Sequence, residues 1–296
     1  NMSHSLYGKS ILDLTEMTKA ELLSIIELAV AIKAQPDDYR QALAGKILAM
    51  IFEKNSTRTR VSFEAGIIQL GGQAIVLDSK STQMGRGEPV KDTAKVLSGY
   101  VDGIMIRTYS DQMVQELTAQ ATVPVINGLT DHHHPCQILA DFQTIYEVKG
   151  KLEGLKLAYI GDGNNMVHSF LIGGSLVGMD IAIATPKGYE PKPKFIEIAQ
   201  KNAAVSQSNI EISHDPVKAV EQADVLVTDV WASMGNEAEQ KEREAVFQEF
   251  QVNQQLAAFA KEDYLFLHCL PAHRGEEVTA EIIDGAHSAI YQEAEN

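Results

Sequence analysis

The chain has 296 residues, of which 45% are hydrophobic and 22% charged, a composition typical of about two globular domains. Its formal net charge of −15 argues against nucleic acid and anionic membranes as partners. The two cysteines, Cys136 and Cys269, do not form a disulfide framework and favour a reducing compartment, so we expect a cytoplasmic protein.

The first predicted element is a helix that follows the capping-box pattern Thr18-Lys19-Ala20-Glu21 and ends near Gln35 and Pro36. Its apolar stretch, Leu22–Ile32, is interrupted by Glu27. The helix is therefore predicted to be amphipathic, and the sequence predicts neither a signal peptide nor a membrane span. We assign this helix no chemistry.

An apolar run, Ile47–Phe52, predicts a buried strand that leads through Ser56–Arg60 into a helical pattern. This order places hydroxyl groups and Arg58 at a helix N-terminus, where free backbone N–H groups and the helix dipole favour an anion. The guanidinium of Arg58 adds a planar set of donors suited to phosphate or carboxylate. Alternatively, Ser56 and Thr57 only cap the helix, and the arginines lie on a solvated face.

The segment FEKNSTRTRVSFE, residues 52–64, resembles the carbamoyl-phosphate signature of the aspartate and ornithine carbamoyltransferases. The resemblance extends over most of the segment, with Asn55 standing where many members carry proline. It implies that the phosphate of carbamoyl phosphate is bound by Ser56, Thr57, Arg58 and Thr59.

Short apolar runs then alternate with helical patterns, as in a parallel sheet covered by helices. The predicted strands of this half are Ala74–Leu77, Ile104–Ile106 and Val123–Ile126, with helices from Pro89 to about Gly99 and from about Pro135. In open α/β sheets, ligands bind beyond the carboxyl ends of the strands. Four polar side chains follow such ends: Arg58, Gln83, Arg107 and His134.

The segment Asp131–Gln137, DHHHPCQ, is unusual. Three histidines and a cysteine suggest a metal site, but adjacent residues rarely point at one ion, and no second ligand cluster lies at metal-like spacing. The segment also resembles the His-Pro-x-Gln element of the same family. That resemblance implies that His134 and Gln137, together with Arg107, contact the carbamoyl group. It assigns no role to the other two histidines.

The polar segment Ser81–Glu88, STQMGRGE, contains two glycines and no apolar period, which is typical of a flexible surface loop. It is also similar to a stretch that, in ornithine members of the family, reaches into the active site of a neighbouring subunit. The resemblance implies that Gln83 contacts the phosphate there, and that the chain forms a homotrimer with sites shared between subunits.

In the second half, a predicted strand, Leu155–Ile160, leads into GDGNNM at residues 161–166. This segment invites comparison with the dinucleotide-binding pattern G-x-G-x-x-G. Met166 occupies the third glycine position, and the next strand, Ile181–Ala184, ends in threonine and proline rather than an acid for a ribose. A nicotinamide cofactor is therefore not expected. The family resemblance implies instead that Asn165 binds the amino-acid end of ornithine.

A further strand, Ala223–Thr228, leads into Asp229 and the segment Ser233-Met234-Gly235. Asp229 could simply cap or hydrogen-bond a loop. The segment as a whole resembles the substrate loop of the ornithine branch, in which Asp229, Ser233 and Met234 would bind ornithine. A carboxylate suits the α-ammonium group, whereas putrescine has no α-centre and would leave this loop without its ligand.

The last predicted core strand, Tyr264–Leu267, precedes His-Cys-Leu-Pro at residues 268–271. A lone Cys269 is most often a small buried core residue. The four-residue string resembles the ornithine branch, because the aspartate branch has His-Pro-Leu-Pro. The resemblance places Cys269 and Leu270 beside the reacting amine and carbamoyl group, and makes Arg107, His134 and Cys269 the expected catalytic residues.

We therefore expect an α/β protein with two open, mainly parallel-sheet domains and the active site in the cleft between them. Gly150–Gly154 is the best candidate for a linker, which gives residues 1–149 for carbamoyl phosphate and 150–296 for ornithine. The resemblance implies carbamoyl transfer to L-ornithine, giving L-citrulline and phosphate without metal or cofactor, and favours a role in arginine biosynthesis. The alternatives are a carbamoyltransferase for another amine, such as putrescine, and a non-catalytic anion- or amino-acid-binding protein.

Overall fold

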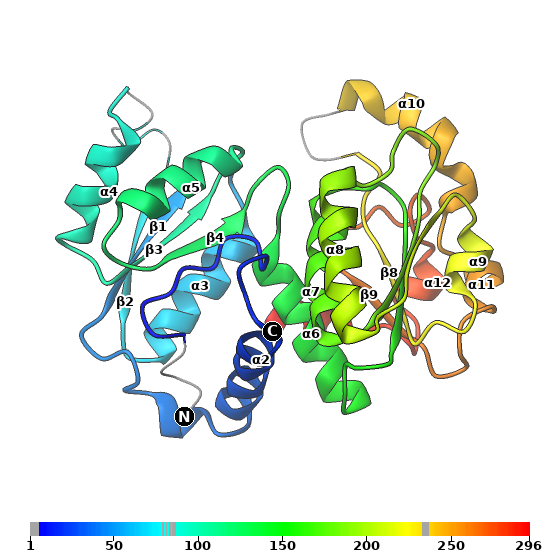
Figure 1. Ribbon diagram of the computed structural model, residues 1–296, viewed down its shortest axis with the longest axis horizontal. Helices are drawn as coiled ribbons and strands as arrows, with labels where there is room; N and C mark the ends of the chain where they lie inside the picture. Colours follow the sequence, from blue (N-terminus) through cyan, green and yellow to red (C-terminus); the bar gives the residue numbers. More distant parts are fainter. Residues whose placement is uncertain (1–5, 79, 81, 83, 85–86, 233–236) are drawn as a thin grey trace. The chain divides into compact units, whose positions relative to one another are not determined.

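The computed structural model describes residues 6–78, 80, 82, 84, 87–232 and 237–296. The chain divides into two compact units, Asn1–Cys136 and Gln137–Asn296, each built around a sheet with helices on its faces (Figure 1). Both sheets are parallel, which confirms the predicted fold class of two parallel-sheet α/β domains. The predicted boundary at residues 149 and 150 and the predicted active-site cleft stay predictions.

The described part of the first unit contains a four-stranded sheet in the order β2-β1-β3-β4 (Figure 1). The interior strand β1 is apolar throughout because both of its faces are covered, with Leu48 and Met50 in one hydrophobic cluster and Ala49 and Ile51 in another. The strands are β1 (Ile47–Phe52), β2 (Gln73–Asp78), β3 (Gly103–Arg107) and β4 (Val125–Leu129).

Different helices cover the two faces of this sheet. Phe63 and Ile67 of α3 pack against the Leu48 and Met50 cluster. The opposite face receives Ala94 of α4 and residues of α5. The helices are α2 (Lys19–Ala34), α3 (Thr57–Gln69), α4 (Val90–Ser98) and α5 (Asp111–Gln120), with a short 3₁₀ turn η1 (Pro36–Tyr39). The predicted capping box is confirmed, since Thr18 and Glu21 exchange side-chain and backbone hydrogen bonds at the start of α2.

The prediction for β4 was wrong at both ends, because the strand begins at Val125 and continues to Leu129. Two residues of low strand propensity extend it. Asn127 is buried, and its side-chain amide donates to the Leu12 carbonyl (2.8 Å). At Gly128, a Cβ atom would lie 2.7 Å from the sulfur of Met105 and 3.1 Å from the backbone oxygen of Ile106, so glycine allows the close approach to β3.

The described part of the second unit contains a five-stranded sheet in the order β7-β6-β5-β8-β9 (Figure 1). The chain proceeds outward from β5 to β7 and then returns to place β8 on the other side of β5. The carboxyl ends of β5 and β8 therefore form a topological switch point, where ligands of such sheets bind. The strands are β5 (Lys156–Ile160), β6 (Asp180–Ala184), β7 (Ile210–Ser213), β8 (Val225–Thr228) and β9 (Leu265–His268).

One face of this sheet packs against a large hydrophobic cluster that includes Trp231, Phe247 and Phe250. On the central strand, Ala158 and Ile160 belong to this cluster. The helices of the unit are α6 (Pro135–Lys149), α7 (Asn165–Val177), α8 (Pro193–Ser206), α9 (Pro216–Val220), α10 (Glu237–Phe247), α11 (Gln254–Ala257), α12 (Ala280–Ile283) and α13 (Ile290–Glu295), with the 3₁₀ turn η3 (Gln248–Phe250).

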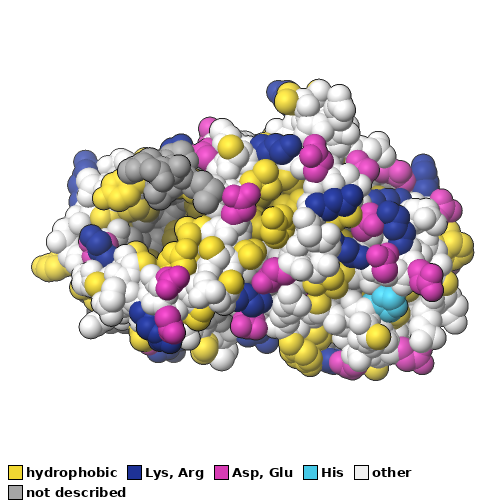
Figure 2. Space-filling view, turned by 90° about the horizontal axis from the view of Figure 1, so that it is seen from below, with side chains coloured by type: hydrophobic (Ala, Val, Ile, Leu, Met, Phe, Trp, Pro, Cys, Tyr) yellow, Lys and Arg dark blue, Asp and Glu magenta, His cyan; other side chains and the backbone are white. Residues whose placement is uncertain are grey.

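On the face of the molecule in Figure 2, Lys and Arg side chains are interspersed with Asp and Glu side chains rather than gathered into one basic field. That distribution does not favour binding of a nucleic acid backbone by this face. Within the described residues, every helix is too short or too polar to span a membrane.

Candidate active site

In the first unit, the candidate site begins where β1 ends and α3 starts. The hydroxyl of Ser56 accepts a hydrogen bond from the backbone N–H of Thr59 (3.3 Å), which confirms that Ser56 caps the helix. Thr57 and Arg58, the first two residues of the helix, are exposed. The first turn of a helix offers backbone N–H groups without partners inside the helix, so this end can still receive an anion.

Arg107 connects β3 to this helix start. Its Nη1 donates to the hydroxyl of Thr59 (3.1 Å). Its backbone oxygen accepts from the N–H groups of Glu53 (2.9 Å) and Lys54 (3.4 Å), so the turn after β1 is fixed to the end of β3. The structure thus brings together Thr59 and Arg107, which lie 48 residues apart in the sequence. These two residues form a donor-rich edge at the carboxyl ends of neighbouring strands.

His134 precedes Pro135, the first residue of α6. Burial, and then the positive charges of Arg107 and Lys54, lower the pKa of His134 to about 3. The imidazole is therefore neutral near pH 7 and can act as an N–H donor without carrying charge. Lys54 was missed at the sequence level as a site residue. Its position inside the same phosphate-binding signature is the signal that could have identified it.

The metal interpretation of DHHHPCQ is not supported by the side-chain positions. His132 Nδ1 pairs with Asp111 (2.8 Å), and His133 Nε2 lies 3.7 Å from a carboxylate oxygen of Asp13. The thiol of Cys136 donates to the carbonyl oxygen of Asn127 (3.5 Å). Within the described residues, the groups close enough to share an ion include none of these histidines or this cysteine. The two histidines instead tie loops of the first unit together.

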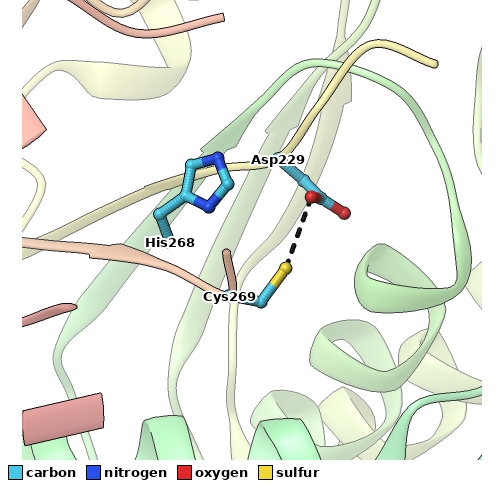
Figure 3. A group of neighbouring side chains, drawn as sticks. All are labelled: Asp229, His268 and Cys269. Carbon is cyan, nitrogen blue, oxygen red and sulfur yellow. Dashed lines mark hydrogen bonds between the residues drawn. The ribbon is translucent and has the colours of Figure 1, made fainter. Parts of the chain in front are cut away.

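In the second unit, Asp229 lies where the loops after β5, β8 and β9 meet. It is buried, and Oδ2 accepts a hydrogen bond from the side-chain amide of Asn164 (2.8 Å). Its Oδ1 accepts from the N–H of Val230 (2.8 Å) and from the thiol of Cys269 (3.3 Å), the contact drawn in Figure 3. The structure thus brings together Asp229 and Cys269, which lie 40 residues apart in the sequence. Asn165, the next residue after Asn164, opens α7.

Asn164 was missed at the sequence level, although it adjoins the predicted Asn165. Its Oδ1 caps α7 by accepting from the N–H groups of Met166 (3.1 Å) and Val167 (3.4 Å), while its Nδ2 binds Asp229. Gly163, just before it, must be glycine, because a Cβ there would lie 2.4 Å from the backbone nitrogen of Pro191. The loop that carries both asparagines is therefore closely fitted.

Burial, followed by the negative charge of Asp229, raises the pKa of the Cys269 thiol well above its ordinary value. A protonated thiol can donate a hydrogen bond but is a poor nucleophile, so the site does not favour a covalent cysteine intermediate.

A buried pair, His268 and Glu277, fixes the segment that contains Cys269 and Leu270. The N–H of Leu270 donates to His268 Nδ1 (2.8 Å), so the proton of the neutral ring lies on Nε2, which contacts a carboxylate oxygen of Glu277 (2.8 Å). That oxygen also accepts from the N–H of His273 (2.9 Å). Leu270 has φ of +59°, a costly conformation for leucine that such fixed surroundings maintain.

In the part of the chain that the structure describes, two groups of side chains are close enough to share a metal ion: Asp229 with His268 and Cys269, and His273 with Glu276 and Glu277. In the first group, both ring nitrogens of His268 already have partners. The thiol of Cys269 donates a hydrogen bond to Asp229 (Figure 3). This group is therefore satisfied as a hydrogen-bond network. The second group is tied into the same network by Glu277 and by the contact of His273 Nδ1 with Glu276 (2.9 Å).

Arg243 of α10 connects the segment after Asp229 with the loop after β5. Its Nη1 donates to the carbonyl oxygen of Trp231 (2.7 Å) and lies 3.2 Å from Asp162. Burial is the main cause that raises the pKa of Asp162 to about 6, although Arg243 opposes the shift.

Three predicted site residues, Gln83, Ser233 and Met234, lie outside the described residues. Gln137 lies in the first turn of α6, where its side chain contacts two carboxyl groups of the second unit. Leu270 follows Cys269 in the segment fixed by His268.

Comparison with known proteins matches both halves of the chain to one family. Residues 9–147 match the model for the carbamoyl-P binding domain of aspartate/ornithine carbamoyltransferase, and residues 153–296 match that for its Asp/Orn binding domain. The ornithine carbamoyltransferase of Listeria innocua is 61% identical over 290 residues, covering 98% of this chain and 92% of the relative. Among solved structures, the ornithine carbamoyltransferase of Pyrococcus furiosus has a TM-score of 0.95 and 53% identity, covering 98% of this chain and 93% of that chain. The anabolic ornithine carbamoyltransferase of Campylobacter jejuni has a TM-score of 0.90 and 42% identity, and the match covers 97% of this chain and 94% of that chain.

Proposed function

Because the chain belongs to the aspartate/ornithine carbamoyltransferase family, we propose that it transfers the carbamoyl group of carbamoyl phosphate to the side-chain amine of L-ornithine. The products are L-citrulline and phosphate. The observation that carries the proposal is the presence of two complementary sites. A helix start with Thr59 and Arg107 lies in the part matched to carbamoyl-phosphate binding, and the buried Asp229 lies in the part matched to amino-acid binding.

The start of α3 binds the phosphate that leaves. The backbone N–H groups of the first turn, the hydroxyl groups of Ser56, Thr57 and Thr59, and the guanidinium of Arg58 supply donors and positive potential. Arg58 is exposed in the chain alone, so it can turn toward a ligand without breaking an internal contact among those described.

Arg107 and His134 donate to the carbonyl oxygen of the carbamoyl group. Negative charge grows on this oxygen as the amine attacks, and donors held in place before the reaction stabilise it most. The low pKa of His134 supports a neutral donor in this role. Gln137, Cys269 and Leu270 contact the remaining atoms of the carbamoyl group.

Ornithine binds in the second unit, with its α-ammonium group on Asp229 and its amino-acid end on Asn165. Ser233 and Met234 complete this contact. The attacking amine resembles that of lysine, with an unperturbed pKa of about 10.4, and only its neutral form is a nucleophile. Once the amine is neutral, much of the rate enhancement comes from holding it in a fixed orientation and at a fixed distance from the carbamoyl carbon.

The active assembly is a homotrimer in which Gln83 of one subunit completes the site of the next. Apolar side chains on α3 and on the edge strand β2 support an interface there, because Val61, Ile68 and Ile75 are 58%, 57% and 46% exposed. The cellular role is arginine biosynthesis in the cytoplasm.

The reaction is tested by measuring carbamoylated product from carbamoyl phosphate with L-ornithine, L-aspartate or putrescine as the acceptor. We expect citrulline from ornithine and little product from the other two. Faster turnover of putrescine than of ornithine would make putrescine the substrate. If no amine gives a product, the protein binds its ligands without catalysing the transfer.

The shared site is tested by mixing two strongly impaired variants, Arg58→Ala and Gln83→Ala, after dissociation and reassembly, and by assaying the mixture at a low concentration of carbamoyl phosphate. In a cyclic trimer, about a quarter of the junctions then combine an intact Arg58 with an intact Gln83. We expect about a quarter of wild-type activity. Activity that stays at the average of the parents, although a mass tag shows that subunits exchange, would place the whole site within one chain.

A further inference from the structure

Two buried carboxyl groups lie directly behind Gln137. Asp141, one turn further along α6, and Glu293 on α13 are 0% and 1% exposed. The side-chain nitrogen of Gln137 donates to Asp141 Oδ1 (3.0 Å) and to Glu293 Oε2 (3.3 Å). Glu293 Oε1 accepts from the backbone N–H of His268 (2.9 Å). The pair therefore joins Gln137 to the segment that contains Cys269.

Two adjacent carboxyl groups in the interior cannot both carry charge, so they hold a proton between them. Burial raises the pKa of Asp141 to about 6, and burial followed by the charge of Asp141 raises the pKa of Glu293 well above its ordinary value. The pair therefore keeps one negative charge, and Asp141 Oδ1 is the carboxyl oxygen nearer to the side-chain nitrogen of Gln137 (3.0 Å, against 3.3 Å to Glu293 Oε2). Asp229, His268 and the Cys269 thiol are titratable groups that interact with the pair.

The carboxyl pair determines which way the amide of Gln137 faces. An ionised carboxylate is an acceptor only, so the NH₂ group of the amide must lie against Asp141. The opposite orientation would place the carbonyl oxygen of Gln137 against a charged oxygen. The carbonyl oxygen of Gln137 is consequently turned away from the pair.

We infer that Asp141 and Glu293 are positioning residues that present the Gln137 carbonyl oxygen as a hydrogen-bond acceptor for the NH₂ group of the carbamoyl substrate. The inference rests on the proposed function, because it takes Gln137 as a contact of the carbamoyl group. It deepens that function by giving the site a means to select a carbamoyl phosphate over an acyl phosphate. Acetyl phosphate carries a methyl group of similar size at the same position and has no proton to donate there.

The decisive variant is Asp141→Asn, because the new amide can donate to Gln137 and allows its side chain to turn over. Steady-state kinetics would give the KM for carbamoyl phosphate, and competition would give the inhibition constant of acetyl phosphate. We expect the KM to rise about tenfold while the inhibition constant stays within about twofold, since one hydrogen bond to the substrate is lost. A general loosening of the site would weaken both ligands equally and would refute the inference.

Two further variants serve as matched comparisons. Glu293→Gln imitates the protonated acid and should preserve the preference for carbamoyl phosphate to within about threefold. Glu147→Gln, also on α6, removes a carboxylate that binds Asn296 of the α13 segment (2.6 Å) without contacting Gln137, and should change neither constant. If Asp141→Asn does not fold, Asp141→Ser provides the same test, because its hydroxyl can also donate to Gln137.

Gln137→Ala separates the inference from the proposed function. Suppose that wild type forms citrulline but Gln137→Ala still prefers carbamoyl phosphate over acetyl phosphate as strongly as wild type does. Gln137 then does not contact the carbamoyl NH₂ group, and the assignment of that contact fails together with the inference. If Gln137→Ala loses the preference while Asp141→Asn keeps it, only the positioning role of the pair is refuted.

Discussion

The neutral state of His134 can be tested directly, because its consequences for proton binding are large. In an unfolded chain a histidine has a pKa of about 6.5, whereas burial and two nearby cations lower that of His134 to about 3. At about 1.4 kcal/mol for each tenfold change, this difference corresponds to about 5 kcal/mol between the two protonation states. The unfolded chain binds more protons between these values, so the stabilisation is present above pH 6.5 and is lost as the pH falls toward 3.

The change in stability follows from the same values. At pH 5, protonation of this histidine in the unfolded chain alone lowers the free energy of unfolding by about 2 kcal/mol relative to pH 8. His134→Gln removes this contribution. Between pH 8 and pH 5, wild type should therefore lose about 2 kcal/mol more stability than the variant in urea unfolding followed by circular dichroism. Contributions from the other histidines cancel in the comparison.

Nuclear magnetic resonance of histidine-labelled protein without ligands gives the pKa itself. The ring signal that disappears in His134→Gln should not titrate between pH 8 and about pH 4. A midpoint near 6.5, or equal pH dependence of the two proteins in unfolding, would contradict a buried neutral donor. The proposed role of His134 as an uncharged donor to the carbamoyl oxygen would then need to be replaced.

Three other substitutions test the remaining parts of the site. Arg58→Ala should raise the KM for carbamoyl phosphate roughly 10- to 100-fold, because charged hydrogen bonds of about 1.5–3 kcal/mol are lost. As a control, Arg60→Ala removes only a surface pair with Glu64 and should leave this KM unchanged. Equal effects of the two substitutions would mean that both arginines are structural. Asp229→Asn should weaken ornithine in calorimetry and leave carbamoyl phosphate nearly unaffected, whereas equal losses would place Asp229 outside the ornithine contact. Gly163→Ala should destabilise the protein by about 1–3 kcal/mol and raise the KM for ornithine, because its Cβ would meet the backbone of 189–191. Unchanged thermal unfolding would show that this loop is free to move.

The strands that could be predicted are those with a continuous apolar sequence. β1, β5 and β8 are interior strands covered on both faces, so local composition identifies them to within two residues of their ends. The edge strand β7 (Ile210–Ser213) was missed, because its residues are only partly buried and its pattern is short. The edge strands β2 and β9 were predicted because each contains a continuous apolar run, which the Ile-Glu-Ile-Ser sequence of β7 lacks.

The residue types of the site were easier to predict than their partners. Arg107 and Asp229 follow strand ends, which the sequence indicates. Asn164 and Asp229 are 65 residues apart, and Gln137 and Glu293 are 156 residues apart. These contacts depend on strand order and on how distant helices pack, and periodicity along the chain does not encode either. The buried pair of Asp141 and Glu293 could not be distinguished in the sequence from ordinary surface acids.

The hydrogen bonds already made by Asp229 have a consequence for stereochemistry. A carboxylate offers about four lone-pair positions, and the contacts from Asn164, Val230 and Cys269 use three of them. In the proposed ornithine contact, the fourth would fix the direction of a single N–H bond of the amino acid. Chirality needs three separate points of attachment, so Asp229 alone cannot tell an L-amino acid from its mirror image. Handedness must come from where the α-carboxylate and the side chain are held once that first bond is made.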